Sequence, residues 1–285
     1  NVIDRAVGRG LDRKDCAIPA RIGVDEKSFA RGHKYETIVY DIDRGTVEFV
    51  VDDRSQGSLE AYYAQFSRTE LSDVKAIAMD MWDPFITATN AYVPDAESKI
   101  VFDRFHVMRH VLDAVDKVRK AEHEVLQKQG NTILKGTKYY WLYSKENLPE
   151  FKQEEFAALR KEDLKVCRAW AIKENLRHLW DYRSKGWMVK YFQKWYWWAT
   201  HSKIKPMIKA AKTLKCHIDN IVTHATHHIT NALAEGMNSR IEKVKRMACG
   251  FRNREHYKKA IYFHCGGLEL YPYPPTKPSL KFKLC

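Results

Sequence analysis

Two aspartates at the ends of apolar stretches have the chemistry needed to hold divalent cations. Asp25 falls in RIGVDEKSF (21–29) and Asp80 falls near the end of VKAIAMDM (74–81), and both stretches have the character of strands. If the strands are neighbours in one sheet, the carboxylates converge and repel each other unless a cation lies between them. Oxygen-only ligands select Mg²⁺, or Mn²⁺ as a substitute, over zinc. Two such ions about 4 Å apart can activate a nucleophile and stabilise the leaving oxygen of a phosphodiester.

A third carboxylate is available on a helix near the C-terminus. The stretch from 228 to 255 opens with a helical apolar stripe formed by Leu233, Met237, Ile241, Val244 and Ala248. Glu235 lies about 200° from the first of these on the helical wheel, so it shares the opposite face with Glu242. The pattern alone does not choose between the two glutamates, and it favours an ordinary solvated position for both.

The same segment carries a cluster of cations. They are Arg240, Lys243, Lys245, Arg246, Arg252 and Arg254. One interpretation is a solvated charged helix face. The functional interpretation is that these side chains hold DNA phosphates beside a scissile bond, which positions DNA without reading its sequence. Arg246 is the strongest candidate because it lies within about 20° of Glu235 on the wheel.

The composition favours a polyanionic partner. The chain has 285 residues and a net charge of +13, from 49 Lys and Arg against 36 Asp and Glu. Such an excess indicates nucleic acid ahead of a membrane, with solubility alone as the alternative. No stretch approaches the roughly 20 apolar residues of a membrane span. The six cysteines are scattered without a C-x-x-C pair, which argues against a zinc ribbon or disulfide framework and fits a reducing cytoplasm.

The first hundred residues have the pattern of a mixed sheet with short helices. Three strands, a helix, a strand, a helix and a strand are expected at 21–29, 35–42, 46–53, 59–66, 74–81, 83–92 and 98–105. Asp43, Arg44 and Gly45 supply the turn of a β-hairpin between the second and third strands. The predicted fold class is therefore α/β.

From residue 107 the pattern becomes helical. Residues 107–129 read as one long amphipathic helix, and helical patterns continue to about 225 with breaks near Pro149 and Gly186. The segment WMVKYFQKWYWW (187–198) is the densest aromatic patch. We expect it to pack within a helical core, with stacking on exposed bases as the alternative.

Four blocks of sequence carry a family resemblance. They are GVDEKSFARGHKYETIVYDIDRG, AIAMDMWDPF, KIVFDRFHVMRHV and NALAEGMNSRIEKVKRMACGFRNREHYKKAIYFHCGGLELYP. In this order, from about Ile22 to Pro272, the chain resembles the ISL-three family of bacterial insertion-sequence transposases. The resemblance implies an RNase H-like core with a DDE triad on Asp25, Asp80 and Glu235. It therefore favours Glu235 over Glu242 as the third carboxylate.

The resemblance also singles out Asp103 and His106 in the FDRFH block, at the end of the last core strand. Their expected role is auxiliary. The alternatives are that they shape the site, contact DNA or fix the end of the strand. The implied organisation is a core over 1–106, an all-helical insertion over 107–225, completion of the core over 226–270 and an extended Pro-rich tail over 271–285.

The function implied by the resemblance is cleavage of DNA at transposon ends and strand transfer into target DNA. The implied cofactor is a pair of Mg²⁺ ions, the partners are transposon-end and target DNA, and a homodimer on DNA is expected in a bacterial cytoplasm, associated with the nucleoid. Relatives usually carry an N-terminal zinc-binding segment and a helix-turn-helix, so a chain that opens on Asn1 is expected to begin partway through a longer protein. The alternatives are a nuclease or resolvase that cuts without joining, a catalytically idle DNA-binding descendant and a structural basic protein.

Overall fold

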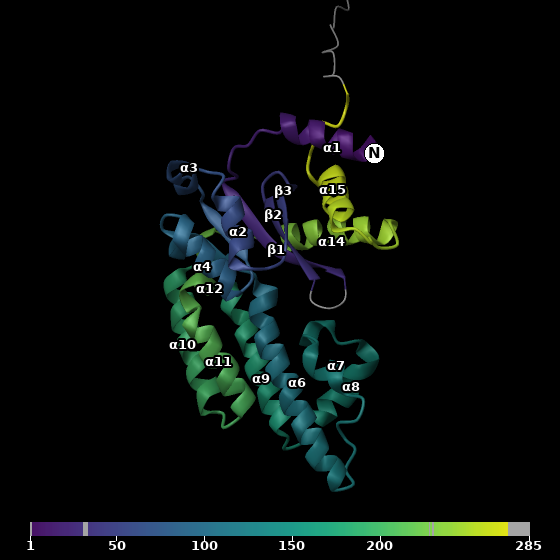
Figure 1. The fold of residues 1–285 in the computed structure, drawn as a ribbon. Coiled ribbons are helices and arrows are strands. Elements are labelled where there is room, and N and C mark those ends of the chain that lie inside the picture. Colours follow the sequence, from purple (N-terminus) through teal and green to yellow (C-terminus); the bar gives the residue numbers. More distant parts are fainter. Residues whose placement is uncertain (1, 31–33, 228, 230, 273–285) are drawn as a thin grey trace, which may run out of the picture. The chain divides into compact units, whose positions relative to one another are not determined.

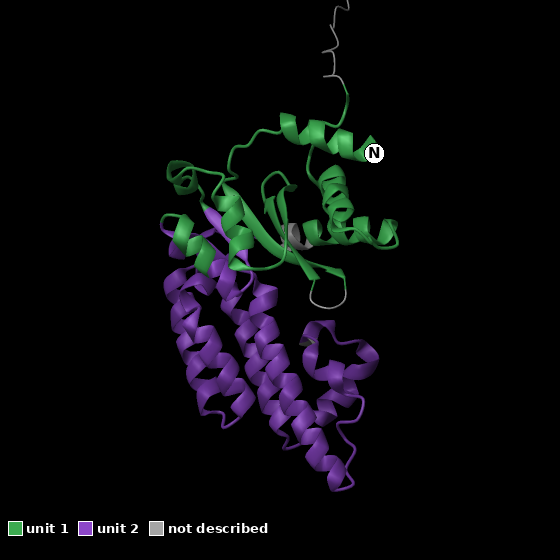
Figure 2. Ribbon diagram, in the orientation of Figure 1, with its two compact units in different colours: residues 1–75, 87–94, 232–285 green, residues 76–86, 95–231 purple. Residues whose placement is uncertain are grey.

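A computed structural model describes residues 2–30, 34–227, 229 and 231–272 (Figure 1). The chain forms two compact units (Figure 2). Unit 1 is built from residues 1–75, 87–94 and 232–285, and unit 2 from residues 76–86 and 95–231. The strand order of the five-stranded sheet is β3 (Thr46–Asp52), β2 (Lys34–Asp41), β1 (Arg21–Ala30), β4 (Ala76–Met79) and β5 (Ile100–Phe102).

Three antiparallel strands form the sheet of unit 1. They are β1 (Arg21–Ala30), β2 (Lys34–Asp41) and β3 (Thr46–Asp52), and Val39 on β2 pairs with Val24 on one side and Phe49 on the other. The turn between β2 and β3 is closed by the Asp41 carboxylate, which accepts hydrogen bonds from the backbone N–H groups of Asp43 and Arg44 at 2.7 and 3.0 Å. The predicted hairpin is confirmed.

Gly23 is required where β1 meets β2. It pairs with Tyr40, and a Cβ atom at position 23 would lie 2.0 Å from Cζ of the tyrosine ring. Tyr40 is buried at 3% exposure, so its ring has no room to move aside. The absence of a side chain at Gly23 therefore lets the two strands close around this ring, two residues before Asp25.

The helices of unit 1 are α1 (Val2–Arg13), α2 (Gln56–Tyr63), α3 (Arg68–Ser72), α14 (Asn231–Met247, of which 231 falls in unit 2) and α15 (Arg254–Cys265). The hydroxyl of Tyr262 on α15 accepts a hydrogen bond from the Val50 N–H at 2.9 Å, which fixes α15 on β3. The sequence patterns did not predict α1. Its Arg9 and Arg13 donate hydrogen bonds to the carbonyl oxygens of Leu270 and Tyr271 at 3.1 and 2.8 Å.

Two short parallel strands belong to unit 2. They are β4 (Ala76–Met79) and β5 (Ile100–Phe102), and every residue in both is buried. Both are shorter than the predicted 74–81 and 98–105. Helix α5 (Ala96–Lys99) takes the residues before β5, and Asp103 begins a helix after it. Helix α4 (Asp83–Tyr92) crosses the boundary between the units and agrees with its predicted range.

The remainder of unit 2 is helical. Its elements are α6 (Arg104–Lys128), α7 (Lys138–Leu142), η1 (Lys145–Asn147), α8 (Glu150–Leu159), α9 (Lys165–Leu176), η2 (Arg177–Asp181), α10 (Lys185–His201), α11 (Lys205–Cys216), α12 (Ile218–Val222) and α13 (His224–His227). Helices α6, α9, α10 and α11 pack side by side (Figure 1). The predicted long helix at 107–129 and the break at Pro149, the N-cap residue of α8, are confirmed. The predicted break near Gly186 is also confirmed, because residues 182–184 separate η2 from α10, which begins one residue before this glycine.

The aromatic patch on α10 is only partly a core. Met188, Phe192, Trp195 and Ala199 form the buried face, with Trp195 at 1% exposure. Trp187 and Trp197 are 60% and 62% exposed, so the expectation of core packing is wrong for them. The two sets lie on different faces because α10 turns by about 100° per residue.

Residues 273–285 of the predicted tail lie outside the described residues. Over the part of the chain that is described, no helix is both long and apolar enough to cross a membrane.

Candidate active site

Asp25 lies on β1 in unit 1, directly after the buried residues Ile22, Gly23 and Val24. Its side chain is 13% exposed. One carboxylate oxygen accepts a hydrogen bond from the Glu26 N–H at 2.7 Å, and the other lies 3.5 Å from Nζ of Lys27. The buried strand thus fixes a carboxylate at a point where solvent, or a bound ion, still has access.

Asp80 follows the last residue of β4 in unit 2, and the structure brings it together with both auxiliary residues. Nδ1 of His106 lies 2.6 Å from Oδ1 of Asp80 and 3.5 Å from Oδ2 of Asp103. Asp103 is the N-cap residue of α6, with its Oδ1 accepting from the Phe105 N–H at 2.7 Å. Asp103 directly follows β5, so its expected place at the end of this strand is confirmed, whereas the same expectation is wrong for His106, which lies in the first turn of α6. The backbone bond from Asp103 N–H to Met79 O, at 3.2 Å, ties this turn to the end of β4.

The two carboxylates control the charge of His106. Burial lowers the pKa of this imidazole, but its contacts with Asp103 and Asp80 outweigh burial and raise the pKa to about 10. His106 is therefore a cation at neutral pH. It offsets the repulsion between Asp80 and Asp103, and it holds one oxygen of Asp80 in place.

Glu235 lies on α14, but its side chain is outside the described residues, as are those of the neighbouring residues 231–234. Later on this helix, Met237, Ile241 and Val244 are buried at 3%, 1% and 4% exposure. This confirms the middle of the predicted apolar stripe, whereas Ala248 is exposed and the stripe ends before it.

Half of the predicted DNA-binding cations are held by protein oxygens within unit 1. Arg240 donates to the carbonyl oxygens of Gly45 and His264 at 2.8 and 3.3 Å, and Lys245 donates to Ser28 O at 2.6 Å. These contacts anchor α14 to the strands and to α15. The guanidinium of Arg254 is held by the carboxylate of Glu36 at 2.7 Å.

The other three cations are exposed to solvent. Arg246 is 74% exposed, and its one ion-pair contact among the described residues, to Glu242, is at 4.0 Å. Lys243 and Arg252 are also exposed, and no ion pair holds either of them to a described residue. These three side chains are the ones available to an external phosphate.

A buried glutamate in unit 1 was not singled out by the sequence patterns. Glu36 on β2 is 0% exposed and contacts Arg254 of α15, which is also 3.5 Å from Asp52. Burial raises the pKa of Glu36 to about 7, although the charge of Arg254 opposes this shift. The available signal was the position of Glu36 early in a predicted strand, just before the apolar residues Ile38 and Val39.

The donor chemistry of the two aspartates fits a divalent cation. Asp25 and Asp80 offer carboxylate oxygens at positions 13% and 21% exposed, and Mg²⁺ prefers such hard oxygen ligands. Among the side chains that the structure describes, a set without Glu235, no group of three or more His, Cys, Asp or Glu residues is placed to hold a metal ion.

Comparison with known proteins identifies the family. The family model of the ISL-three (ISL3) DDE transposases, described as "Transposase", matches residues 22–261. The chain is 26% identical over 239 residues to the transposase for insertion sequence element IS1001 of Bordetella parapertussis, covering 83% of this chain and 58% of that protein. It is 25% identical over 256 residues to the transposase for insertion sequence element IS1557 of Mycobacterium tuberculosis (strain ATCC 25618 / H37Rv), covering 82% of this chain and 57% of that protein.

The chain therefore spans somewhat more than half the length of these relatives. No solved structure matches it significantly. The five-stranded mixed sheet, flanked by helices and followed by a long helical stretch ahead of α14, agrees with the RNase H-like fold that the resemblance implies. On the match across residues 22–261, this chain belongs to the ISL-three family of transposases.

Proposed function

We propose that this chain is the catalytic part of a DDE transposase, which cuts DNA at the ends of an insertion sequence and joins the ends to target DNA. The observation that carries the proposal is that two partly exposed carboxylates each come directly after buried residues of a strand. Asp25 follows buried residues of β1 in unit 1, and Asp80 follows β4 in unit 2, where its Oδ1 lies 2.6 Å from Nδ1 of His106. The family match and the names of the curated relatives support the same function.

In this proposal Asp25, Asp80 and Glu235 hold a pair of Mg²⁺ ions. When bound, such ions activate an attacking oxygen and stabilise the leaving oxygen of a phosphodiester. Two attacking groups are needed in turn: water for cleavage, and the freed 3′ hydroxyl for joining. No covalent bond between protein and DNA is required, so no serine or tyrosine nucleophile is assigned.

The surrounding side chains have positioning roles. His106 holds Asp80 through its 2.6 Å contact, and Asp103 keeps His106 in place as it caps α6. Lys243, Arg246 and Arg252 are exposed and bind phosphates in the proposal, whereas Arg240, Lys245 and Arg254 hold α14 and α15 on the strands. Because transposition pairs two DNA ends, we also propose that two copies of the protein act together on DNA.

The proposal is tested by replacing Asp80 with asparagine. Asp80→Asn removes a metal-binding charge, so nicking of a supercoiled plasmid in Mg²⁺ falls by about a hundredfold or more, while DNA binding in EDTA is retained. Asp83→Asn is the matched control, since Asp83 is an exposed aspartate three residues further on. Normal nicking by Asp80→Asn, or equal loss in both variants, would show that Asp80 is not a metal ligand.

A second assay separates a transposase from a nuclease on the same fold. Oligonucleotide duplexes with pre-cut 3′ ends are incubated with the protein, Mn²⁺ and a plasmid target. Joined products are expected from a transposase. Cutting of intact ends without joining of pre-cut ends favours the nuclease or resolvase alternative, and neither activity favours the idle DNA-binding descendant.

A further inference from the structure

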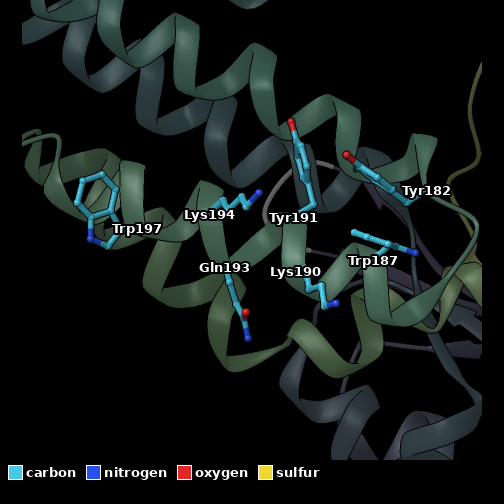
Figure 3. A pocket seen from close by; sticks show the side chains of 7 residues that line it. All are labelled: Tyr182, Trp187, Lys190, Tyr191, Gln193, Lys194 and Trp197. Atoms are coloured by element: carbon cyan, nitrogen blue, oxygen red, sulfur yellow. The ribbon is translucent and has the colours of Figure 1, made fainter.

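One face of α10 exposes aromatic rings and lysines that the proposed catalytic function does not use. A hollow of about 520 Å³ in unit 2 is lined by Tyr182, Trp187, Lys190, Tyr191, Gln193, Lys194 and Trp197. We call it the α10 groove. In Figure 3, Trp187 and Tyr182 lie at one end of the groove and Trp197 at the other, with the lysines and Tyr191 between them.

The exposed rings are not required by the fold of α10. The helix is held in unit 2 by its buried face, where Trp195 donates a hydrogen bond to Ile172 O at 2.8 Å. Trp187 and Trp197 lie away from that face and expose 60% and 62% of their surface. Exposed large aromatic residues that gather in one place mark an interaction site rather than a packing need.

Neighbouring side chains contact the rings of the groove. Nζ of Lys190 lies 4.8 Å from the centre of the Trp187 ring, and the ring of His201 stacks on Trp197 at 4.5 Å. The hydroxyl of Tyr191 donates to Asn175 O at 2.7 Å. Trp187 and Trp197 are ten residues apart, so they are separated by about 15 Å along the helix, which is the length of about four stacked nucleotides.

Positive charge predominates around the groove, with the Asp181 carboxylate, which acts on Tyr191, as an acidic neighbour. Residues 182–217 contain nine Lys and Arg and no Asp or Glu. All nine are exposed, and none makes an ion pair with a described residue. They are Arg183, Lys185, Lys190, Lys194, Lys203, Lys205, Lys209, Lys212 and Lys215. This excess of positive charge is complementary to an anionic occupant.

We infer that the α10 groove binds unpaired DNA, with bases stacked on Trp187 and Trp197 and phosphates held by Lys190 and Lys194. Aromatic rings stack on bases of any sequence, and a basic surface beside them tracks the backbone. A duplex does not satisfy the rings, because its base faces are already covered by neighbouring bases. The choice of DNA over RNA rests on the proposed function.

The test measures binding of a fluorescent single strand of about 16 nucleotides to the full chain in EDTA, which prevents cutting. Trp187→Ala and Trp197→Ala each weaken binding by about tenfold, because one base loses its stacking partner. Trp187→Tyr keeps most of the affinity, and a duplex of the same sequence binds the wild type and Trp187→Ala alike. Phe151→Ala is the matched control, because Phe151 is 81% exposed in unit 2 but does not line the groove.

Two further readouts are independent of whether an alanine variant folds well. Lys190→Gln and Lys194→Gln each lower the salt slope of single-strand binding by about 0.7, the loss of one phosphate contact. Photocrosslinking of a bromouracil-substituted strand to the wild type labels the peptide that contains Trp187 or Trp197.

Several outcomes would overturn the inference. They are wild-type single-strand affinity in both tryptophan variants, crosslinks only outside 182–201, tighter binding of an RNA of the same sequence, and displacement of the strand by anionic vesicles. The last two would assign the groove to RNA or to a lipid surface. Failure of this inference is distinguishable from failure of the proposed function, since plasmid nicking depends on Asp80 and single-strand binding in EDTA does not.

Discussion

At the scale of single residues, the structure identifies the partners of charged side chains that the sequence shows only as part of a pattern. His106 is the clearest case, because it lies against Asp80 and Asp103 at 2.6 and 3.5 Å. The arginines differ in the same way. Arg246 is open to solvent, whereas Arg254 is committed to Glu36, although both are cations in one short segment.

The buried Glu36 predicts a specific pH dependence of stability. Its pKa is about 7 in the folded chain against an ordinary 4.5, so between these values the folded state keeps a proton that the unfolded state has released. The stability from this group is therefore fully present below pH 4.5 and is lost as the pH rises to about 7. The advantage of wild type over Glu36→Gln in free energy of unfolding falls across this window, by at most about 1.4 kcal/mol per pH unit.

Urea unfolding at a series of pH values measures this difference. Glu269→Gln, an exposed glutamate of the same unit, serves as the control for loss of a carboxylate. A constant difference between wild type and Glu36→Gln from pH 4.5 to 7 would mean that Glu36 keeps an ordinary pKa in the folded protein.

At the scale of elements, the turn between β5 and α6 joins structural stability to the candidate site. Asp103 accepts the Phe105 N–H as the N-cap residue of α6, and it also contacts His106. Asp103→Ala removes the cap and lowers the free energy of unfolding by about 0.5–2 kcal/mol. Asp103→Asn keeps an oxygen acceptor and retains most of that stability.

Thermal or urea unfolding of the two Asp103 variants separates the contribution of the helix cap to stability from that of the charge beside His106. If Asp103→Asn is as unstable as Asp103→Ala, the charge beside His106 stabilises this turn and the cap does not.

The sequence patterns predict elements well where local chemistry decides them. The β2–β3 hairpin follows from its turn residues and alternation, and the long helix α6 follows from its apolar spacing. The exposed face of α10 was not predicted, because an aromatic-rich helix gives no local signal of which ring lies inward. Contacts between distant residues, such as Glu36 with Arg254, were likewise inaccessible, since no periodicity within either segment records its partner.

For the candidate site, the family resemblance supplied residue assignments that local sequence patterns do not contain. It singled out Asp25, Asp80 and Glu235 among many acids, and it drew attention to Asp103 and His106. The contacts of His106 came from the structure alone. The sequence also could not tell which of the six cations are available to bind phosphate. All six lie in one basic stretch, and only their tertiary contacts distinguish them.

At the scale of the whole molecule, the net charge of +13 makes DNA binding strongly dependent on salt. Removing a true phosphate contact lowers the slope of log affinity against log salt by about 0.9 on duplex DNA. We expect this change for Arg246→Gln, measured by anisotropy with a labelled duplex over a range of salt concentrations. Arg254→Gln instead destabilises the fold, because Glu36 loses its partner, and it leaves the slope of the folded protein unchanged.

The reverse result is a lower salt slope for Arg254→Gln and an unchanged salt slope for Arg246→Gln. It would mean that Arg254 leaves its contact with Glu36 when DNA binds.

The discontinuity of unit 1 has a consequence for how the protein is made. This unit needs residues 1–75, 87–94 and 232–285, whereas the helices of unit 2 come from the stretch between. On a ribosome the helical middle emerges complete while α14 and α15 are still being translated, and chains fold largely in the order of synthesis. β1–β3 must therefore wait, with one face uncovered, until residues 232–285 have been translated. A prematurely terminated product would contain Asp25 and Asp80 without Glu235, and would depend on chaperones to keep its unfinished sheet from aggregating.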